Sequence, residues 1–408
     1  MELVRPTTQP WLEPAAYWGA FDRATAELDP PFGVISLTAL AHNAFDLLDR
    51  ADGMPIRVAS KSVRVRSVLD AVLALPGYHG VLAYTLAEAL WLAESIEDVV
   101  VGYPSADRAS IAKLAASPQL ASRVTVMVDS VDHLDFIDSV LGSGKREPIR
   151  VCLELDASFH SKALGHIGVY RSPVRTVAQG VAVARSIVDR PGFVLVGMMS
   201  YEAQIAGVTN EPPGRPLLGR TVRWAQKNSY AELLDRRVKV VAAVRELAEL
   251  EFVNGGGTGS IERTVADPAI TEVAAGSGLF GPHLFDGYRH FSPAPAAAFA
   301  LPVVRKPRAD MATLLGGGWI ASGPTAPDRS PQLAWPKGLE YVSREGAGEV
   351  QTPLRGKSAA ALKVGDRVWL RHTKAGEISE HLDDFAVVDG EQIIETVPTY
   401  RGEGRVFL

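Results

Sequence analysis

The chain has 408 residues, of which 47% are hydrophobic and 22% are charged, with a formal net charge of −5 and a pI near 6.0. This composition is typical of a globular protein that is long enough for a large core and two domains, and it excludes a mainly disordered chain. No basic run is long enough to follow a phosphate backbone, so we expect no nucleic-acid partner.

The cellular compartment is indicated by cysteine usage and by the apolar segments. The single cysteine, Cys152, cannot form an internal disulfide, and the first residues, MELVRPTTQPWLEP, lack the basic start and apolar core of a signal peptide. The longest apolar stretch, GVLAYTLAEALWLAE, is interrupted by Glu88 and Glu94 and is too short to span a membrane. We therefore expect a cytoplasmic protein with no membrane contact.

In chain order, short apolar runs alternate with helical patterns over the first 276 residues. The strand-like runs are IRVAS (56–60), GVLAY (80–84), DVVVG (98–102), RVTVMV (123–128), IRVCLEL (149–155), FVLVGMM (193–199), EFVN (251–254) and EVAAG (272–276). Segments between them, such as TLAEALWLAE, TVAQGVAVARSIV and the long AELLDRRVKVVAAVRELAEL (231–250), have helical periodicity. Continuous apolar strands suit a parallel sheet that is buried on both faces, so the pattern predicts a (β/α)8 TIM-type barrel, with an open doubly wound sheet as the alternative.

From about Ser292 the pattern changes, because proline and glycine clusters replace the long helical segments. LKVGDRVWLRH (362–372) and FAVVDGEQIIETVP (385–398) read as strands, with Asp389-Gly390 as a hairpin turn. We expect three parts: a segment over 1–38 whose run FGVISL (33–38) adds a strand to the β-rich domain, a barrel over 39–291, and the β-rich domain over 292–408.

Polar residues follow several of the predicted barrel strands, where barrel enzymes place their chemistry. They are Lys61 after the first strand, Asp156 and His160 after the fifth, Ser200, Tyr201 and Glu202 after the sixth, Asn254 with GGGTGS (255–260) after the seventh, and Gly276-Ser277-Gly278 after the eighth. Adjacent glycine-rich loops after the last two strands favour a bound phosphate, although GGGTGS alone is equally compatible with a simple tight turn.

Lys61 and the glycine loops together suggest one cofactor. A lysine amine opposite a phosphate cradle is the arrangement that holds pyridoxal 5'-phosphate as a Schiff base, and desolvation at a strand end favours the neutral, nucleophilic amine. Taken alone, Lys61 is better explained as an ordinary surface lysine.

The chain resembles the pyridoxal-phosphate enzymes of the alanine racemase-like fold, and within them the D-threonine aldolase and D-serine dehydratase group. The resemblance lies in the order and spacing of RVASKS, ELD (154–156), GMMSYEAQ (197–204), VNGGGTGS, TEVAAGSGLF (271–280) and the C-terminal LKVGDRVWLRH…EISEHLDDFAVV. It implies that Lys61 carries the cofactor, that Tyr201 lies by its ring, and that the phosphate is bound by Gly256, Gly257, Thr258, Gly276 and Ser277. It also implies a homodimer and a small amino-acid substrate.

His381-Leu382-Asp383 is a candidate site for a divalent metal. On a strand, residues two apart project to the same side and can share one ion, although HxD is common by chance and also fits a solvated strand end. In the resembled group the aldolases carry a histidine and an aspartate at this place, which implies a manganese, magnesium or zinc ion held by His381 and Asp383 that grips the substrate's β-hydroxyl. Asp384 competes with Asp383 for this role.

The resemblance therefore predicts a metal-assisted lyase acting on a β-hydroxy D-amino acid, by retro-aldol cleavage of the Cα–Cβ bond or by dehydration and deamination. An amino-acid racemase is the main alternative, for which Tyr341 or Tyr400 would have to supply a second base. A non-catalytic cofactor-binding protein is the third reading, but such proteins are usually single-domain barrels.

Two departures from the resembled pattern concern the catalytic base and the group that faces the pyridine nitrogen. The expected histidine after the sixth strand is Gln204 here, so Glu202, His160 or His166 would have to replace it. The fifth-strand region reads His166-Ile167-Gly168-Val169 where an arginine precedes Gly-Val in the group. The segment 207–224, rich in proline and glycine, is a candidate lid, dimer contact or inert loop.

Overall fold

The computed structural model describes residues 1–142, 146–161, 164–324 and 326–408. The chain packs into two compact units. The β unit comprises Met1–Asp46, Ser62–Val72 and Ser277–Val406, and the barrel unit comprises Leu47–Lys61, Leu73–Gly276 and Phe407–Leu408. The sequence placed boundaries only at 38 and 291, whereas each unit is assembled from segments that are separated along the chain.

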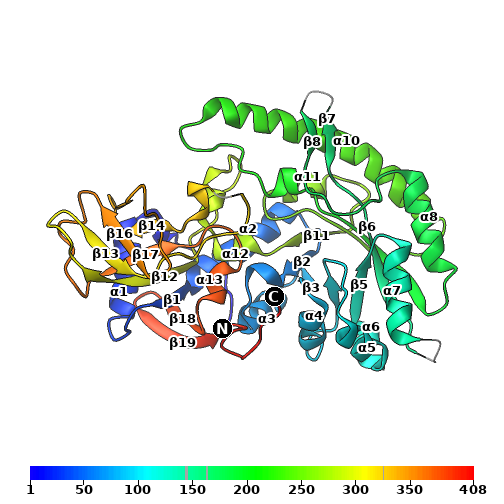
Figure 1. Ribbon diagram of the computed structural model, residues 1–408, viewed down its shortest axis with the longest axis horizontal. Coiled ribbons are helices and arrows are strands. Elements are labelled where there is room, and N and C mark those ends of the chain that lie inside the picture. The colour runs from blue at the N-terminus through cyan, green and yellow to red at the C-terminus, as the bar shows by residue number, and fades with distance from the viewer. Residues whose placement is uncertain (143–145, 162–163, 325) are drawn as a thin grey trace. The chain divides into compact units, whose positions relative to one another are not determined.

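The barrel unit contains a closed barrel of eight parallel strands in the order β10-β11-β2-β3-β4-β5-β6-β9 (Figure 1). In chain order these strands are β2 (Ile56–Ala59), β3 (Tyr78–Ala83), β4 (Val99–Val101), β5 (Val124–Val128), β6 (Ile149–Glu154), β9 (Phe193–Ser200), β10 (Phe252–Gly255) and β11 (Glu272–Ala275). Each predicted apolar run forms one of them, so the predicted barrel is confirmed.

Helices follow most of the barrel strands. They are α4 (Leu86–Leu92), α5 (Arg108–Ala115), α6 (Pro118–Arg123), α7 (Val131–Leu141), α8 (Val177–Val188), α9 (Ala203–Ala206), α10 (Pro216–Arg245) and α11 (Ile261–Val265), with the hairpin β7 (Phe159–Ser161) and β8 (Gly165–Ile167) after β6. Local capping sets several helix starts: the Thr85 side chain accepts from the Glu88 backbone N–H at α4, and Thr176 and Gln179 form a capping box at α8.

The barrel interior combines an apolar layer with a buried ion network. Cys152, Met127, Val196 and Phe252 pack in the apolar layer. The Arg57 guanidinium makes a bidentate contact with Glu272 at 2.6 and 2.9 Å and reaches Asp98 at 2.9 Å. A buried guanidinium requires such partners, because an unpaired charge would cost several kcal/mol in a low-dielectric interior.

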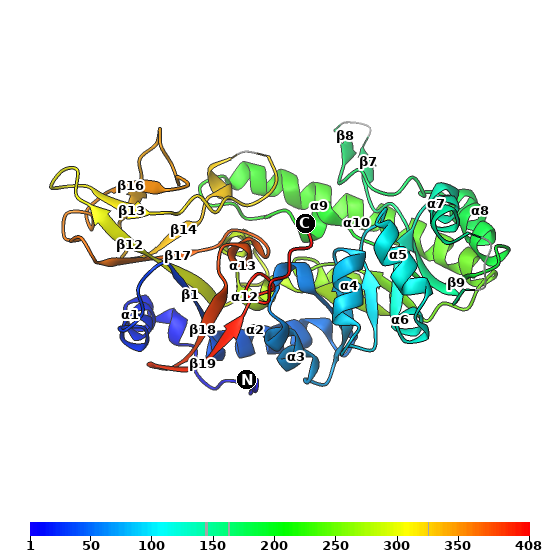
Figure 2. The ribbon, with the colours of Figure 1, turned by 60° about the horizontal axis from the view of Figure 1, so that its bottom comes forward.

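Helix α10 begins closer to the N-terminus than the helix predicted from the sequence. The sequence predicted a helix from residue 231 and a separate loop over 207–224, but α10 begins at Pro216 and is 30 residues long. Residues 216–224 are therefore its first turns, with Pro216 at a position where its missing N–H costs no hydrogen bond. The helix packs against α8, as Figure 1 and Figure 2 show.

The β unit is built on a nine-stranded sheet in which β1 (Phe32–Ser36) pairs antiparallel with β12 (Ala297–Arg305) and parallel with β18 (Asp384–Asp389). Its other strands are β13 (Ala312–Leu315), β14 (Gln332–Trp335), β15 (Glu340–Tyr341), β16 (Gln351–Arg355), β17 (Arg367–Arg371) and β19 (Gln392–Pro398). The hairpin β18–β19 turns at Asp389-Gly390, where Gly390 has φ of 60°.

Aromatic side chains dominate the core of the β unit. Trp369 is fully buried, and rings from α1 (Pro14–Ala24) surround it, with Phe21 at 5.4 Å and Trp18 at 6.1 Å between centroids. The remaining helical segments that begin or lie in this unit are η1 (Pro10–Leu12), α2 (Leu37–Ala51), α3 (Arg66–Leu73), α12 (Ser277–Phe280), η3 (His283–Gly287), η4 (Pro327–Arg329) and α13 (Glu377–Glu380). The predicted β-rich region is confirmed.

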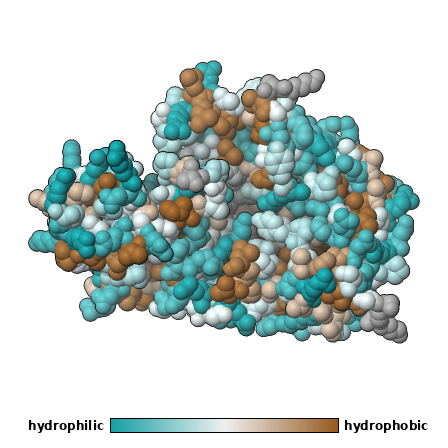
Figure 3. Space-filling model, in the orientation of Figure 1, coloured by the Kyte–Doolittle hydropathy of each residue, from teal (hydrophilic) through white to brown (hydrophobic). Residues whose placement is uncertain are grey.

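Apolar residues on the face drawn in Figure 3 form scattered small groups between polar ones. Within the described residues, every helix falls short of the length or the hydropathy that crossing a bilayer demands.

Candidate active site

Lys61 lies at the mouth of the barrel, in the short helix η2 (Ser60–Ser62) that directly follows β2. Its Nζ donates to the Tyr103 hydroxyl at 3.0 Å. The Arg171 guanidinium lies over the Tyr103 ring at 5.0 Å and over the Tyr201 ring at 4.9 Å. Arg171 also forms an ion pair of 3.6 Å with Glu154, the last residue of β6. We call these five residues the lysine corner.

The charges of the lysine corner shift the titration of its members. Burial opposes ionisation of Tyr103, but Lys61 and Arg171 outweigh it and lower the pKa of this hydroxyl. Burial raises the pKa of Tyr201 to about 12, against the smaller opposing effect of Arg171. Burial also raises the pKa of Glu154 to about 7, so this carboxyl exchanges its proton near neutral pH.

A cavity of about 600 Å³ opens beside Lys61. Its walls are residues that follow β2, β3 and β4, including Tyr84, Leu86 and Tyr103, together with Phe407. The Phe407 ring packs on Trp91 at 5.5 Å and on Tyr84 at 6.5 Å. The amine of Lys61 therefore borders a space of the size that small-molecule sites have, at the end of the barrel where chemistry is expected.

The GGGTGS segment forms a tight loop between β10 and α11, and sheet register brings it to Tyr201. Gly255 pairs with Ser200, so the residues that follow β9 and β10 lie side by side. Gly256 has φ of 80°, which favours glycine, and a Cβ on Gly257 would lie 3.1 Å from the Tyr201 ring. The backbone of this loop is thus packed closely against the tyrosine ring.

Glu202 holds this loop from the inside. Its carboxylate accepts from the Gly256 N–H at 3.2 Å and from the Thr264 hydroxyl at 2.6 Å. It lies 3.7 Å from Arg237, which also pairs with Asp267 at 3.1 Å. On the outside, Arg50 donates to the Thr258 carbonyl at 2.5 Å. We call the loop 255–260 with these partners the loop corner.

Gly276 belongs to the second of the two predicted phosphate-binding loops. Because Ala275 pairs with Val58, Gly276 lies beside Ala59, and a Cβ on Gly276 would approach the Ala59 carbonyl oxygen to 2.3 Å. Only glycine allows this approach between the ends of β11 and β2. Ser277 is the first residue of α12 and belongs to the β unit.

The barrel unit fits pyridoxal phosphate on these observations. A lysine amine lies at the strand end, and two loops, at Gly256-Gly257 and Gly276, have backbones so closely packed that a Cβ would collide with a neighbour. Tyr201 packs closely against the first loop, and Arg171 lies over its ring. Such glycine loops present backbone N–H groups to an anion, and the tyrosine supplies a flat apolar surface for a ring.

The metal pair differs from its prediction. His381 caps the end of α13 and Asp383 precedes β18, so the two do not alternate on a strand as expected. The His381 ring stacks on Trp319 at 4.7 Å, and Asp383, which is exposed, pairs with Arg401 at 3.0 Å. Nowhere in the described parts of the chain do three or more His, Cys, Asp or Glu side chains form a group able to hold a metal. As it stands, this pair does not fit a metal centre.

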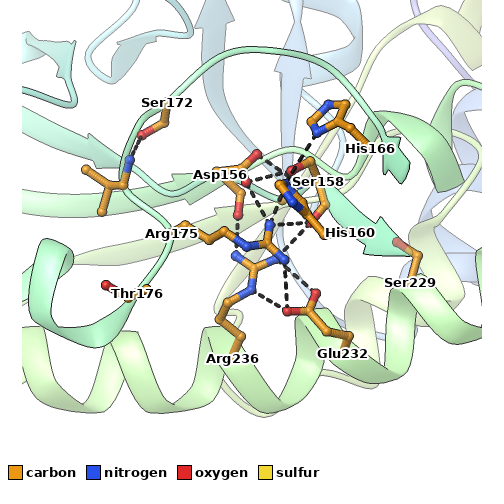
Figure 4. A network of polar contacts seen from close by, with 12 residues as sticks. Asp156, Ser158, His160, His166, Ser172, Arg175, Thr176, Ser229, Glu232 and Arg236 are labelled. Atoms are coloured by element: carbon orange, nitrogen blue, oxygen red, sulfur yellow. Dashed lines mark hydrogen bonds and ion pairs between the residues drawn. The ribbon is translucent and has the colours of Figure 1, made fainter. Parts of the chain in front are cut away.

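Asp156, predicted as a strand-end candidate, belongs to a network of polar contacts that holds the structure together (Figure 4). Its carboxylate accepts from the Ser158 hydroxyl at 2.6 Å and from Arg175 at 2.8 Å. Arg236 of α10 donates to the carbonyl oxygens of Asp156 and Ser158 and pairs with Glu232. These bonds tie the loop after β6 to α10, which accounts for the buried carboxylate without a catalytic role.

The candidates for a replacement base are engaged elsewhere. His160 and His166 lie on the β7–β8 hairpin with their ring nitrogens 3.4 Å apart, and His166 stacks on Tyr170. Gln204 donates to the Ala157 carbonyl and the Ser229 hydroxyl, both at 2.7 Å. Glu202 belongs to the loop corner. Each of these residues is thus held by partners other than Lys61.

Sequence reasoning missed three members of the lysine corner. Tyr103 immediately follows the predicted strand 98–102, so the rule that strand ends carry chemistry could have found it. Glu154 lies inside the quoted stretch ELD. Arg171 follows a hairpin far from any strand end of the barrel, and nothing in its local sequence distinguishes it from other surface arginines.

The sequence relatives of this chain described here are aldolases. No family model matches the chain. The D-threonine aldolase of Arthrobacter sp. is 27% identical over 328 residues, which cover 78% of each protein. The 3-hydroxy-D-aspartate aldolase of Paracoccus denitrificans is 25% identical over 269 residues, which cover 62% of this chain and 61% of that protein.

Solved structures extend the likeness over nearly the whole chain. D-threonine aldolase from Filomicrobium marinum superimposes with a TM-score of 0.76 at 20% identity, over 94% of this chain and 97% of that one. An alanine racemase-like protein from Idiomarina loihiensis gives 0.68 at 14% identity, over 92% and 97%. At these identities the structures establish the fold. The predicted resemblance is thus confirmed, and the chain is a homologue of the D-threonine and 3-hydroxy-D-aspartate aldolases with an alanine racemase-like fold.

Proposed function

We propose that the protein is a pyridoxal-phosphate-dependent lyase that acts on a β-hydroxy D-amino acid. The observation that carries the proposal is the position of Lys61: its amine follows the first barrel strand, is hydrogen-bonded to Tyr103, and borders a cavity of about 600 Å³. The names of the two sequence relatives, both aldolases of β-hydroxy D-amino acids, support the substrate class.

The cofactor, when bound, would withdraw electrons from the bonds at the substrate's Cα. In the proposal Lys61 would hold it covalently, and its phosphate would be bound at the two glycine loops, by Gly256, Gly257, Thr258, Gly276 and Ser277. Tyr201 supports the ring. Arg171, whose guanidinium lies against Tyr201 and Tyr103, contributes a fixed positive charge beside them.

Tyr103 is the group best placed to exchange a proton with Lys61. Its hydroxyl is 3.0 Å from Nζ, and Lys61 and Arg171 stabilise its ionised form. It can therefore orient the amine and accept or return a proton at this atom. This assigns to Tyr103 the task for which the sequence offered Glu202, His160 or His166.

Retro-aldol cleavage is the reaction that we favour: the Cα–Cβ bond breaks, the β-hydroxyl loses its proton, and an aldehyde and glycine are formed. In the dehydration alternative the Cα proton and the β-hydroxyl are lost as water, and hydrolysis of the resulting imine gives an oxo acid and ammonia. A racemase needs a second base, but the Tyr341 hydroxyl donates to the Pro331 carbonyl at 2.8 Å and Tyr400 is 1% exposed. These settings favour the lyase over the racemase.

The decisive experiment is an absorption spectrum of the purified protein before and after borohydride, followed by a peptide map. We expect a visible band that borohydride removes and a reduced cofactor attached to the peptide with Lys61. Glycine and aldehyde, or oxo acid and ammonia, are then measured with several β-hydroxy D-amino acids. A protein that takes up no pyridoxal phosphate, or carries it on another lysine, would refute the proposal.

A divalent ion at His381 and Asp383 and a homodimeric assembly remain predictions. The contacts of the two side chains with Trp319 and Arg401 give no support for the ion, so no step of the reaction is assigned to it. Activity with and without a chelator, followed by return of manganese, magnesium or zinc, tests the first prediction. Light scattering of the purified protein tests the second.

A further inference from the structure

The hairpin formed by β7 and β8 carries two histidines that the proposed function does not use. The two strands pair antiparallel, with Phe159 opposite Ile167 and His160 directly opposite His166. Side chains that are directly opposite on such a pair project from the same face and lie close together. Nε2 of His160 lies 3.4 Å from Nδ1 of His166, and Figure 4 shows the two rings with these nitrogens facing each other.

The distance between these nitrogens fits a shared metal ion better than a direct hydrogen bond. An N–H donor usually lies about 2.7–3.2 Å from its acceptor. Two imidazole nitrogens that each bind one tetrahedral zinc ion at about 2.0–2.1 Å are separated by about 3.3–3.4 Å. Ligands at right angles, as in octahedral or square-planar sites, would be only about 2.9 Å apart at the same bond length. The pair therefore has the spacing of tetrahedral zinc ligands.

The surroundings of the two rings leave both nitrogens able to bind an ion. The His166 ring is held by stacking on Tyr170, with 4.0 Å between the centroids and 12° between the planes. Its Nε2 is buried and has no hydrogen-bond partner among the described residues, so no donor to Nε2 forces the proton onto Nδ1. His160 is exposed, so water can reach the space beside the pair.

We propose that His160 and His166 form a zinc site on the β7–β8 hairpin, with water as the remaining ligands. Neutral imidazole is a preferred ligand of zinc. Within the described residues no third His, Cys, Asp or Glu side chain joins the pair, which is why water completes the tetrahedron. This site is separate from the ion predicted at His381 and Asp383, which belong to the β unit, and it does not depend on the proposed function.

The ion would have a structural effect next to the lysine corner. It would join β7 to β8 through side chains, in addition to the backbone pairing. The segment after β8 leads directly to Arg171, whose guanidinium lies over the Tyr103 ring. On the way, Gly168 packs against Ser158 so closely that a Cβ would lie 3.0 Å from the Ser158 Cα. A restraint at His166 is thus passed along a short, packed segment to Arg171.

The test is titration calorimetry of the purified full chain with zinc chloride, in a His381→Ala background that removes the other predicted ion site. We expect one saturable site. His160→Ala and His166→Phe should each weaken it at least about tenfold, since loss of a ligand costs no less than loss of a hydrogen bond that supports one. His166→Phe keeps a ring that can stack on Tyr170, so its effect separates ligation from folding of the hairpin. His290→Ala, at an exposed histidine outside the hairpin, should leave the affinity unchanged.

Chemical modification identifies the ligands without a substitution. Diethyl pyrocarbonate modifies accessible imidazole nitrogens, and a peptide map then reports each histidine. Zinc should reduce the labelling of His160 and His166 at least about fivefold, since bound nitrogens have no lone pair to react, while His290 stays labelled. Absence of saturable zinc binding, affinity unchanged in both hairpin variants, or equal labelling with and without zinc would each overturn the site.

The restraint on Arg171 has its own measurement. Amide hydrogen exchange of residues 165–171, followed by mass spectrometry, should slow at least about threefold when zinc is added to the wild-type protein, and should not respond to zinc in His166→Phe. Zinc binding without slower exchange would overturn the restraint and leave the site standing. Because neither readout uses turnover or pyridoxal phosphate, failure of the proposed function would leave this inference intact.

Discussion

The lysine corner and the loop corner lie at the same end of the barrel strands and are built differently. In the loop corner, Glu202 and Arg237 are each 1% exposed, and the carboxylate of Glu202 accepts hydrogen bonds from backbone and side chains while it faces the guanidinium. In the lysine corner, Lys61 and Tyr103 line a cavity, and the Arg171 guanidinium lies over the Tyr103 ring. The first arrangement fixes a backbone, and the second leaves an amine accessible.

This difference shows how one end of the barrel can provide both a rigid phosphate-binding loop and an accessible lysine. A phosphate cradle works by preorganised N–H groups, so its loop benefits from rigid, buried polar support. A lysine that must exchange partners needs space and a neighbour that can share its proton. Variants that affect one corner and spare the other test this division.

Lys61→Ala should have the largest effect, the loss of all measurable turnover and of any borohydride-stable label. Because Lys61 borders a cavity, the free energy of unfolding should change by roughly 0.5 kcal/mol or less, as for other substitutions outside the packed core. The spectrum and urea unfolding measure the two quantities. Lys113→Ala, at an exposed lysine on α5, is the control and should keep the label. A label that persists in Lys61→Ala would contradict the division.

Glu202→Ala should destabilise the protein by about 3–5 kcal/mol, because it leaves the buried Arg237 and the Gly256 N–H without this partner. Urea unfolding followed by tryptophan fluorescence measures the change. Glu251→Ala, which breaks the exposed pair with Arg150, serves as the matched control and should cost about 1 kcal/mol or less. Similar losses in both variants would show that the loop corner has no special rigidity.

Glu154→Gln should change the pH dependence of stability. The folded pKa of Glu154, about 7, lies above its ordinary value of 4.5, so between these pH values the folded state keeps a proton that the unfolded chain releases. The free energy of unfolding should therefore fall as pH rises through this window, by at most about 3 kcal/mol from this group, and level off above it.

Urea unfolding at pH 5 and pH 8 measures this slope in the wild-type protein and in Glu154→Gln, where the contribution of residue 154 should disappear. Glu251→Gln, at an exposed position, is the control. An unchanged slope in Glu154→Gln would mean that the carboxyl does not carry the proton at neutral pH.

Tyr103→Phe should have the smallest effect, about a tenfold loss in turnover, equivalent to one hydrogen bond to a charged group. Folding should be unaffected. In cofactor-free protein, competitive labelling of Lys61 with a fluorodinitrobenzene reagent should show a changed pH profile, which a purely structural role would not produce. Tyr170→Phe, at an exposed ring, is the control. An unchanged profile would remove Tyr103 from the lysine corner's chemistry.

The sequence by itself determined the barrel, the β-rich region and the position of Lys61. Each barrel strand is a continuous apolar run because both of its faces are buried, and such runs are legible without knowing their neighbours. Lys61 and GGGTGS directly follow strands, so their place at the barrel end depends on local order alone.

Tertiary structure alone decided which polar residues meet. Arg171 and Tyr103 are distant in sequence and come together because separate loops converge at one end of the barrel. Glu202 instead contacts Arg237 and Thr264. Phe407 joins the cavity wall from the far end of the chain. Contacts of this kind depend on side-chain direction and on the path of each loop, which the order of residues does not specify. They decide that Glu202 holds a loop backbone, whereas Tyr103 lies where it can exchange a proton with Lys61.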